Sequence, residues 1–189
     1  TGLEYCVNLL ALHLWGNTHI SDISPLAGLT NLKELGLQSI DISDISPLAG
    51  LTNLKWLRLN DTNISDISVL AGLTNLESID LSWNHISDIS ALADLTNLQE
   101  LHLRLNHISD ISALARLINL ESLSASENHI SDLSALAGLT NLHWLNLTAN
   151  NIRYISALVD NAGFSDGATV YLRDNPLHAI SINNYIPQL

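Results

Sequence analysis

A 22-residue pattern recurs along most of this chain. Its leucine-containing segment starts at Leu32, Leu54, Leu76, Leu98, Leu120 and Leu142, so that successive starts lie 22 residues apart. The fullest copy, residues 76–97, reads LESIDLSWNHISDISALADLTN and joins L-x-x-I-x-L-x-x-N to S-D-I-S-A-L. A unit this short cannot bury its own apolar side, so neighbouring units must stack and share one core. The pattern therefore predicts an elongated array rather than a globular domain.

The spacing of leucine and asparagine within the unit is typical of a leucine-rich repeat solenoid. The L-x-L core alternates between inward and outward positions, which predicts a short strand. The return path, Ser-Pro-Leu-Ala-Gly-Leu from Ser24 and again from Ser46, is long enough only for a turn of 3₁₀ helix, with each serine as the N-cap. The predicted fold class is α/β: a right-handed leucine-rich repeat solenoid with a curved parallel β-sheet and short 3₁₀ helical convex segments.

The repeats divide the chain into three parts of a single predicted domain, 1–189. Residues 1–8 form a partial N-terminal unit, 9–158 the repeats and 159–189 a C-terminal capping unit, in which 181–185 is predicted to form a short closing helix. Because the chain begins in mid-repeat, we expect that an N-terminal portion has been removed or that another domain preceded it.

One asparagine per unit follows the strand and is predicted to satisfy backbone groups at the turn. Stacked units make a ladder of these side chains: Asn17, Asn84, Asn106, Asn128, Asn150 and Asn175. Ile40 and Thr62 occupy the same position in two successive units. The N-terminal third is therefore predicted to be the irregular end of the array.

Composition limits the classes of partner. The net charge of −12 and the pI near 4.7 argue against nucleic acid or an anionic membrane as the main partner. No apolar run approaches the roughly 18 residues that a membrane span needs, so membrane insertion is not predicted. The lone cysteine, Cys6, aligns with a leucine of the later units and is predicted to be a small core residue. A chain without disulfides fits the cytoplasm or a bacterial surface better than a eukaryotic extracellular domain.

The outward-pointing strand residues and those directly after each strand form the surface that we call the concave face. All four tryptophans of the chain lie on it or at the turn beside it. Exposed Trp, Tyr and Arg are the residue types that dominate interface hot spots, whereas isolated exposed aromatics are also ordinary. The predicted partner-binding residues are Trp15, Trp56, Arg58, Trp83, His102, Arg104, Trp144, Tyr171 and Arg173.

Asp80, His102 and Ser124 share one outward position on three neighbouring strands, in the order acid, base, hydroxyl. An open sheet offers no evident oxyanion hole, and a catalytic serine usually sits on a strained turn. We therefore interpret this row as a chance alignment and predict no catalytic residues.

Two further columns consist of residue types that can bind a metal ion. One holds His85, His107 and His129, with His19 in the equivalent place; the other holds Asp22, Asp44, Asp66, Asp88, Asp110 and Asp132. A straight row of histidines spaced about 5 Å apart does not make a tetrahedral cage, so repeat consensus is the preferred interpretation. The aspartates are predicted to be turn and capping acceptors, with a bound cation as the alternative. No metal or cofactor is predicted.

The consensus N-x-I-S-D-I-S-P-L-x-x-L-T-N-L resembles the internalins, which are bacterial surface proteins, and more distantly the leucine-rich regulatory subunit of protein phosphatase 1. The likeness covers residues 3–158 and is closest at Ser24-Pro25-Leu26 and Ser46-Pro47-Leu48, each preceded by an aspartate. The resemblance implies a rigid curved scaffold that binds another protein on its concave face, located outside the cell or on a bacterial surface. The cytoplasm is the alternative. Within residues 1–189 we expect neither the N-terminal helical cap nor the trailing immunoglobulin-like domain of those proteins, and the last unit differs from theirs.

Together these features predict a non-enzymatic module that recognises a protein partner on its concave face. Two alternatives remain open: a structural spacer within a larger surface protein, and carbohydrate binding through the concave tryptophans. The expected oligomeric state is a monomer, with pairing of two N-terminal edges as the alternative.

Overall fold

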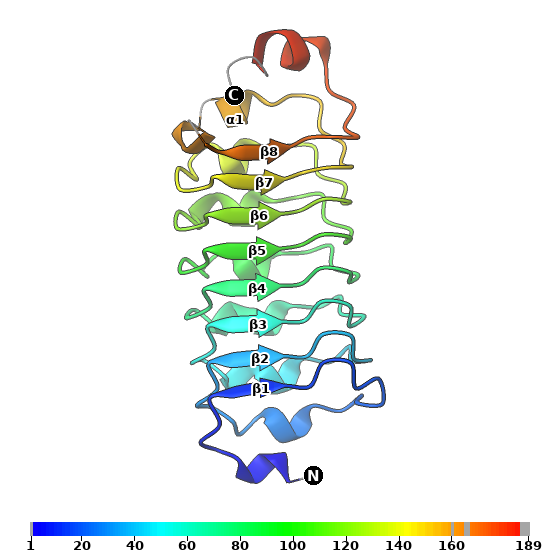
Figure 1. The fold of residues 1–189 in the computed structure, drawn as a ribbon, viewed down its shortest axis with the longest axis vertical. Helices are drawn as coiled ribbons and strands as arrows, with labels where there is room; N and C mark the ends of the chain where they lie inside the picture. Colours follow the sequence, from blue (N-terminus) through cyan, green and yellow to red (C-terminus); the bar gives the residue numbers. More distant parts are fainter. Residues whose placement is uncertain (1, 160, 165–166, 186–189) are drawn as a thin grey trace.

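A computed structural model describes residues 2–159, 161–164 and 167–185. Within them the chain forms one parallel sheet in which eight strands follow one another in sequence order, from β1 to β8 (Figure 1). The strands are β1 Ala11–His13, β2 Glu34–Gly36, β3 Trp56–Arg58, β4 Ser78–Asp80, β5 Glu100–His102, β6 Ser122–Ser124, β7 Trp144–Asn146 and β8 Thr169–Tyr171. The predicted leucine-rich repeat solenoid is confirmed.

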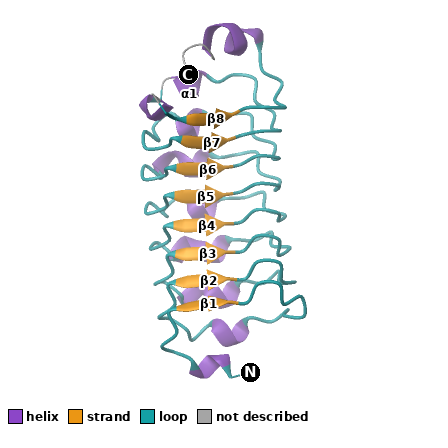
Figure 2. Ribbon diagram, in the orientation of Figure 1, coloured by secondary structure: helices purple, strands orange, loops and turns teal. Residues whose placement is uncertain are grey.

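Short helical turns line the opposite side of the array (Figure 2). The 3₁₀ turns span Leu3–Tyr5, Ser24–Leu26, Ser46–Gly50, Ser68–Gly72, Ser90–Leu92, Ser112–Arg116, Ser134–Leu136 and Ala162–Phe164. The last full unit instead carries a short α-helix, α1 (Ser156–Val159), and a π-helical turn at Ser181–Tyr185 occupies the segment predicted to be the closing helix. No helix in the described part of the chain is both long and apolar enough to cross a membrane.

In the six units from Ser24 to Ser134, the 3₁₀ turn begins at the serine, not after it. Ile23 is the N-cap of the first such turn, and Ser24 is already helical and makes no side-chain cap. The carboxylate of Asp22 accepts the hydrogen bond from the Ser24 backbone N–H instead, at 2.8 Å. Assigning the serine as N-cap was therefore wrong. The serine is the first residue of the turn, and its own backbone N–H is bonded by the preceding aspartate. The prediction that the aspartates are capping acceptors is confirmed.

The same contact recurs in every unit that carries the aspartate. The hydrogen bond from the following serine N–H lowers the pKa of Asp22, Asp44, Asp66, Asp88 and Asp110, because it favours the charged carboxylate.

Acid is expected to lower the thermal stability of the array. A carboxyl whose pKa is depressed on folding contributes stability above its unfolded pKa, about 3.9, and loses that contribution as the pH falls through the folded value. The melting temperature should therefore fall below about pH 4. The double substitution Asp88→Asn/Asp110→Asn keeps an acceptor oxygen but removes the charge, and should reduce this fall when melting is followed between pH 3 and 7. An equal fall in variant and wild type would show that these carboxylates do not carry the pH dependence.

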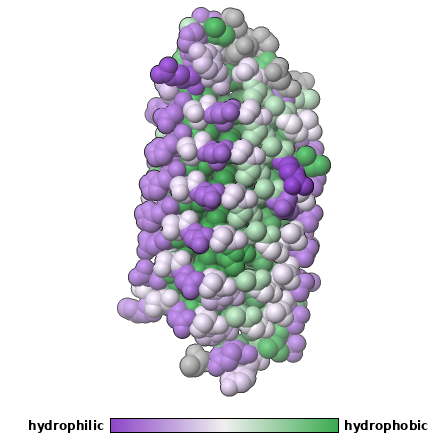
Figure 3. All heavy atoms as spheres, turned by 180° about the vertical axis from the view of Figure 1, so that it is seen from behind, coloured by the Kyte–Doolittle hydropathy of each residue, from purple (hydrophilic) through white to green (hydrophobic). Residues whose placement is uncertain are grey.

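The core is a continuous stack of leucine and isoleucine between the sheet and the helical turns. In register, Leu57, Ile79, Leu101, Leu123 and Leu145 follow one another up the sheet, each no more than 1% exposed. Seen from the helical side, hydrophilic side chains recur in rows along the long axis, beside more apolar strips (Figure 3). Each unit thus presents the same polar positions at regular intervals.

The first unit is the exception to this burial. Leu12 of β1 is only half-buried, and Cys6, at the end of the first 3₁₀ turn, is exposed. The prediction that Cys6 is a core residue was wrong. Among the described residues, those from Gly2 to Leu10 have a neighbouring unit on one side, so a position that is buried in the later units is exposed here.

Candidate recognition surface on the sheet

The strand register sets the predicted binding residues in columns. One column runs through Glu34, Trp56, Ser78, Glu100, Ser122, Trp144 and Thr169, and the next through Gly36, Arg58, Asp80, His102, Ser124, Asn146 and Tyr171. Because strand residues alternate between the two faces, both columns point away from the leucine core. The strands therefore place five of the predicted binding residues on the concave face: Trp56, Arg58, His102, Trp144 and Tyr171.

The first cluster surrounds Trp56. Arg58 on the same strand pairs with Glu34 of β2 at 3.3 Å, and the ammonium of Lys55 lies 5.9 Å from the centre of the Trp56 ring. Lys55 also pairs with Glu77. These charged groups are partly exposed, so each pair contributes no more than about 1 kcal/mol to stability. Their main effect is to fix the positions of the side chains around the indole.

The second cluster joins three consecutive units. The Arg104 guanidinium lies over the Trp83 ring at 5.3 Å and pairs with Glu127 at 2.7 Å. Trp83 and Glu127 have left-handed backbone, with φ of 59° and 57°, which costs a residue other than glycine about 1 kcal/mol or more. Their N–H groups bond to carbonyls of the next unit at 2.8 Å, so the solenoid itself imposes this conformation. The ring and the ion pair are held in place by the backbone.

The third cluster is an aromatic pair on the last two strands. The rings of Trp144 and Tyr171 lie 6.0 Å apart at an interplanar angle of 59°, a geometry that aromatic pairs favour. Tyr171 is exposed and Trp144 half-buried. The pair therefore presents a wide apolar surface with polar edges.

Three predicted residues lie outside these clusters. Trp15 follows β1 and is 64% exposed, the largest exposed fraction among the tryptophans. His102 is half-buried in its column, between Asp80 and Ser124. Arg173 pairs with the adjacent Asp174 at 3.3 Å and is far more exposed than Arg58 or Arg104.

Sequence reasoning missed the partners of the arginines. Glu34, Glu127 and Lys55 were not among the predicted binding residues, yet they complete the first two clusters. A signal for the ion pairs was present: Arg58 lies 24 residues from Glu34, and Arg104 lies 23 from Glu127. In a 22-residue array, opposite charges at these separations fall on neighbouring strands.

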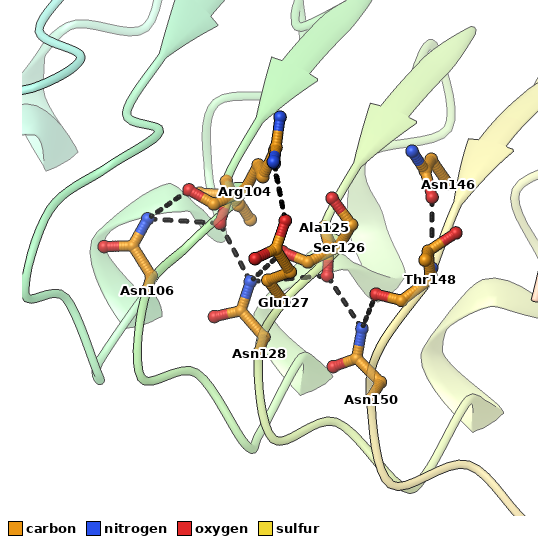
Figure 4. A network of polar contacts seen from close by, with 10 residues as sticks. Arg104, Asn106, Ala125, Ser126, Glu127, Asn128, Asn146, Thr148 and Asn150 are labelled. Atoms are coloured by element: carbon orange, nitrogen blue, oxygen red, sulfur yellow. Dashed lines mark hydrogen bonds and ion pairs between the residues drawn. The ribbon is translucent and has the colours of Figure 1, made fainter. Parts of the chain in front are cut away.

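From Asn84 to Asn175 an asparagine ladder fixes the turns directly beyond the strands, as predicted, whereas Asn17 is exposed and donates to the Leu14 carbonyl of its own unit. Asn128 donates to the carbonyls of Leu103 and Ala125 at 2.9 and 3.3 Å, and its side-chain oxygen accepts from the Ile108 N–H at 3.0 Å. Asn106 and Asn150 repeat this geometry in the neighbouring units (Figure 4). From Asn84 to Asn175 the ladder thus links each unit to the one before it and sets the register of the recognition surface.

The row Asp80, His102 and Ser124 is aligned as the sequence indicates, because the three residues are register partners. The Asp80 carboxylate accepts from the Ser82 backbone N–H at 2.9 Å, and Ser124 is 8% exposed. Within the described residues, no hydrogen bond joins any two members of the row. The aspartate is thus occupied in a local turn.

The histidine column forms a stack. The ring centres of His85 and His107 lie 5.8 Å apart and those of His107 and His129 6.1 Å apart, with the planes within 16° of parallel. Parallel rings direct their nitrogens alongside one another and not toward a common centre. In the part of the chain that the structure describes, no group of three or more His, Cys, Asp or Glu side chains could hold a metal ion.

Comparison with known proteins supports this architecture. The family model for leucine-rich repeats, in two-copy form, matches residues 7–50, 52–94, 80–116 and 118–159. Internalin C2 of Listeria monocytogenes is 39% identical, with a TM-score of 0.82 over 93% of this chain and 74% of its own. A second Listeria protein, internalin F, is 33% identical, with a TM-score of 0.57 over 94% of this chain and 71% of its own. No curated protein matches the chain.

A leucine-rich repeat protein of Leptospira interrogans, 21% identical with a TM-score of 0.71 over 93% of this chain and 51% of its own, shares the fold. Fold and repeat together define a leucine-rich repeat module, a general class of protein-interaction domain. Within that class, the chain belongs to the internalin-like bacterial leucine-rich repeat proteins.

Proposed function

We propose that residues 1–189 form a single recognition domain whose concave face binds a protein partner. Its contact residues are the nine predicted from the sequence, joined by Glu34, Glu127 and Lys55. The observation that carries the proposal is the grouping of Trp56, Trp83 and Trp144 with fixed charged or aromatic neighbours on the sheet face.

The extent of the clusters favours a protein over a small metabolite. Trp56 on β3 and Trp144 on β7 share one register column and are four strands apart, which corresponds to roughly 19 Å at the usual strand spacing. A surface of this length matches an extended segment or a face of another protein. Trp83, with Arg104 across its ring, lies in the unit next to Trp56 and so adds to the same surface.

The charged neighbours also order the side chains of the surface before a partner binds. Arg58 and Arg104 are already paired within the chain, and the paired Arg104 lies over the ring of Trp83. A side chain that is ordered before binding loses less conformational entropy when a partner docks. The clusters therefore favour recognition through the aromatic faces, with the arginines as secondary contacts.

By family, we place the protein outside the cell or on a bacterial surface. A secreted or surface-attached module would meet its partner there, and the low cysteine content agrees with a bacterial source.

Trp56→Ala and Trp144→Ala are each expected to weaken partner binding about 30-fold, the effect of losing a hot spot worth about 2 kcal/mol. Partners would be captured from the source's own extract and from candidate host-cell membranes, and affinities measured by surface plasmon resonance. Ile118→Ala is the matched control, because Ile118 is an exposed apolar residue (58%) outside the concave face. If a partner binds the folded Trp56→Ala/Trp144→Ala double variant as tightly as wild type, recognition on the concave face would be contradicted and the structural spacer favoured.

Carbohydrate binding by the tryptophans makes a different prediction for the same proteins. It requires a change in tryptophan fluorescence with soluble glycans in the absence of any protein partner. The same response in the Trp56→Ala/Trp144→Ala protein would place the sugar elsewhere.

A further inference from the structure

The column of Ser-Asp pairs changes at its C-terminal end. Six units carry a serine and an aspartate immediately before the Ile or Leu that caps the helical turn, the last of them at Ser131 and Asp132. The next unit has Arg153 and Tyr154 there, 22 residues further on. Tyrosine cannot cap the turn as the aspartates do, and the turn that follows is the only described α-helix of the sheet units, α1. This unit gives up the capping contact and places a cation and an aromatic ring on the surface.

Arg153 and Tyr154 line a groove of about 470 Å³ beside the starts of the Ser134–Leu136 turn and of α1. Its other polar walls include Asp132, Asn151 and Ser156. A groove of about 440 Å³ occupies the equivalent place between two earlier units, but its ionisable walls are Asp88 and Asp110. The two grooves are similar in size and both contain aspartate, but only the one near the C-terminal end adds a cation and an aromatic ring. The groove between the earlier units can therefore be compared directly with the groove that Arg153 and Tyr154 line.

The C-terminal segment braces the new pair. The Arg153 carbonyl accepts hydrogen bonds from the His178 N–H and the Ser181 hydroxyl, both at 2.9 Å. The His178 ring packs against the Tyr154 ring at 5.3 Å, and its Nδ1 accepts from the Ile180 N–H. Tyr154 nevertheless remains 55% exposed. The ring is thus fixed in orientation and open to a ligand.

The charges in the groove are not paired with each other. One oxygen of Asp132 accepts from the Ser134 N–H at 2.8 Å, which leaves the second oxygen available. Among residues 2–159, 161–164 and 167–185, no carboxylate lies within 4 Å of the Arg153 guanidinium. An unpaired cation, an open ring, a carboxylate oxygen and an amide therefore surround one groove.

We propose that this Arg153–Tyr154 groove binds a terminal sugar that carries a carboxylate, of the hexuronic acid class. The sugar's C–H face stacks on Tyr154, its carboxylate pairs with Arg153 in two-point geometry, and its hydroxyls bond to Asp132 and Asn151. The groove volume lies within the roughly 300–1,000 Å³ typical of small-ligand sites. A long polyanion is disfavoured by the net charge of −12. The site is independent of the concave face.

The test is a titration of ¹⁵N-labelled protein with glucuronic acid and, separately, with glucose. Glucuronic acid should cause saturable amide shifts at residues 131–134 and 151–157, with a Kd about tenfold lower than that of glucose because only the acid pairs with Arg153. Arg153→Ser/Tyr154→Asp should abolish these shifts. That variant restores the pair present in six other units, so it is designed to fold. Ile118→Ala, at an exposed position outside both the groove and the concave face, should bind glucuronic acid as wild type does.

Several results would overturn the proposal. Equal affinity for glucose would refute recognition of the carboxylate, and shifts outside the groove or unchanged binding by the double variant would refute the site. N-acetylglutamate amide serves as the peptide-like competitor. If it binds the groove as tightly as glucuronic acid, the ligand is an acidic peptide rather than a sugar.

Discussion

Replacing Asn106 by alanine is expected to lower the free energy of unfolding by about 3–5 kcal/mol, because three backbone groups lose a buried partner. The Asn106 side chain donates to the carbonyls of Leu81 and Leu103 at 3.0 and 3.1 Å and accepts from the Ile86 N–H at 2.9 Å. The residue is only 5% exposed, so water cannot readily replace these contacts. Each unsatisfied buried group costs about 1–3 kcal/mol.

Asn97→Ala is the matched control for this prediction. Asn97 belongs to the same unit type but is exposed and makes one side-chain hydrogen bond, to the Thr74 carbonyl at 2.9 Å. Its replacement should cost about 0.5–1.5 kcal/mol. Urea unfolding of both variants, followed by circular dichroism, gives the comparison.

The chain itself suggests an intermediate variant. Thr62 occupies a ladder position, and its hydroxyl donates to the Leu59 carbonyl at 2.7 Å. Asn106→Thr should therefore retain part of the stability that Asn106→Ala loses. If Asn97→Ala were as damaging as Asn106→Ala, the ladder would not be the main polar element that joins the units.

The position of the predicted recognition residues could be derived from the sequence because it depends only on period. The 22-residue repeat sets which strands are neighbours, and alternation within L-x-L sets which side chains face outward. The period therefore predicts that Trp56 and Trp144 share one column, and the strand register agrees.

The contacts within the clusters could not be derived in the same way. That Arg104 both covers Trp83 and pairs with Glu127 depends on side-chain rotamers and on left-handed backbone at Trp83 and Glu127. A consensus that tolerates Trp, Leu, Glu and Ala at that position gives no sign of positive φ. The prediction that Cys6 is buried was wrong for another reason. Alignment to the repeat assumes a neighbouring unit on both sides, whereas among the described residues the first unit has a neighbour on one side.

Leu101→Ala is expected to destabilise the protein by about 3–5 kcal/mol, the cost of deleting a fully buried leucine from a packed core. Leu101 is 0% exposed and stacks in register between Ile79 and Leu123. Leu12→Ala removes the equivalent side chain from β1, where it is half-buried, and should cost roughly 1–2 kcal/mol.

The two leucine variants also test whether a loss of stability stays local to the unit in which the leucine is removed. Stability in a solenoid is close to a sum of unit and interface contributions, so the loss in Leu101→Ala should be concentrated near β5. Amide hydrogen exchange should accelerate most in β4 to β6 for this variant, and only near β1 for Leu12→Ala. Because Trp56, Trp83 and Trp144 lie on or beside fully packed strands, local loosening at β5 should weaken partner binding strongly. Loosening at β1 should weaken it less, because Trp15 is the one predicted contact residue beside that strand. Equal losses of stability in the two variants would mean that the first unit is as well supported as the centre, which its exposed and half-buried residues contradict.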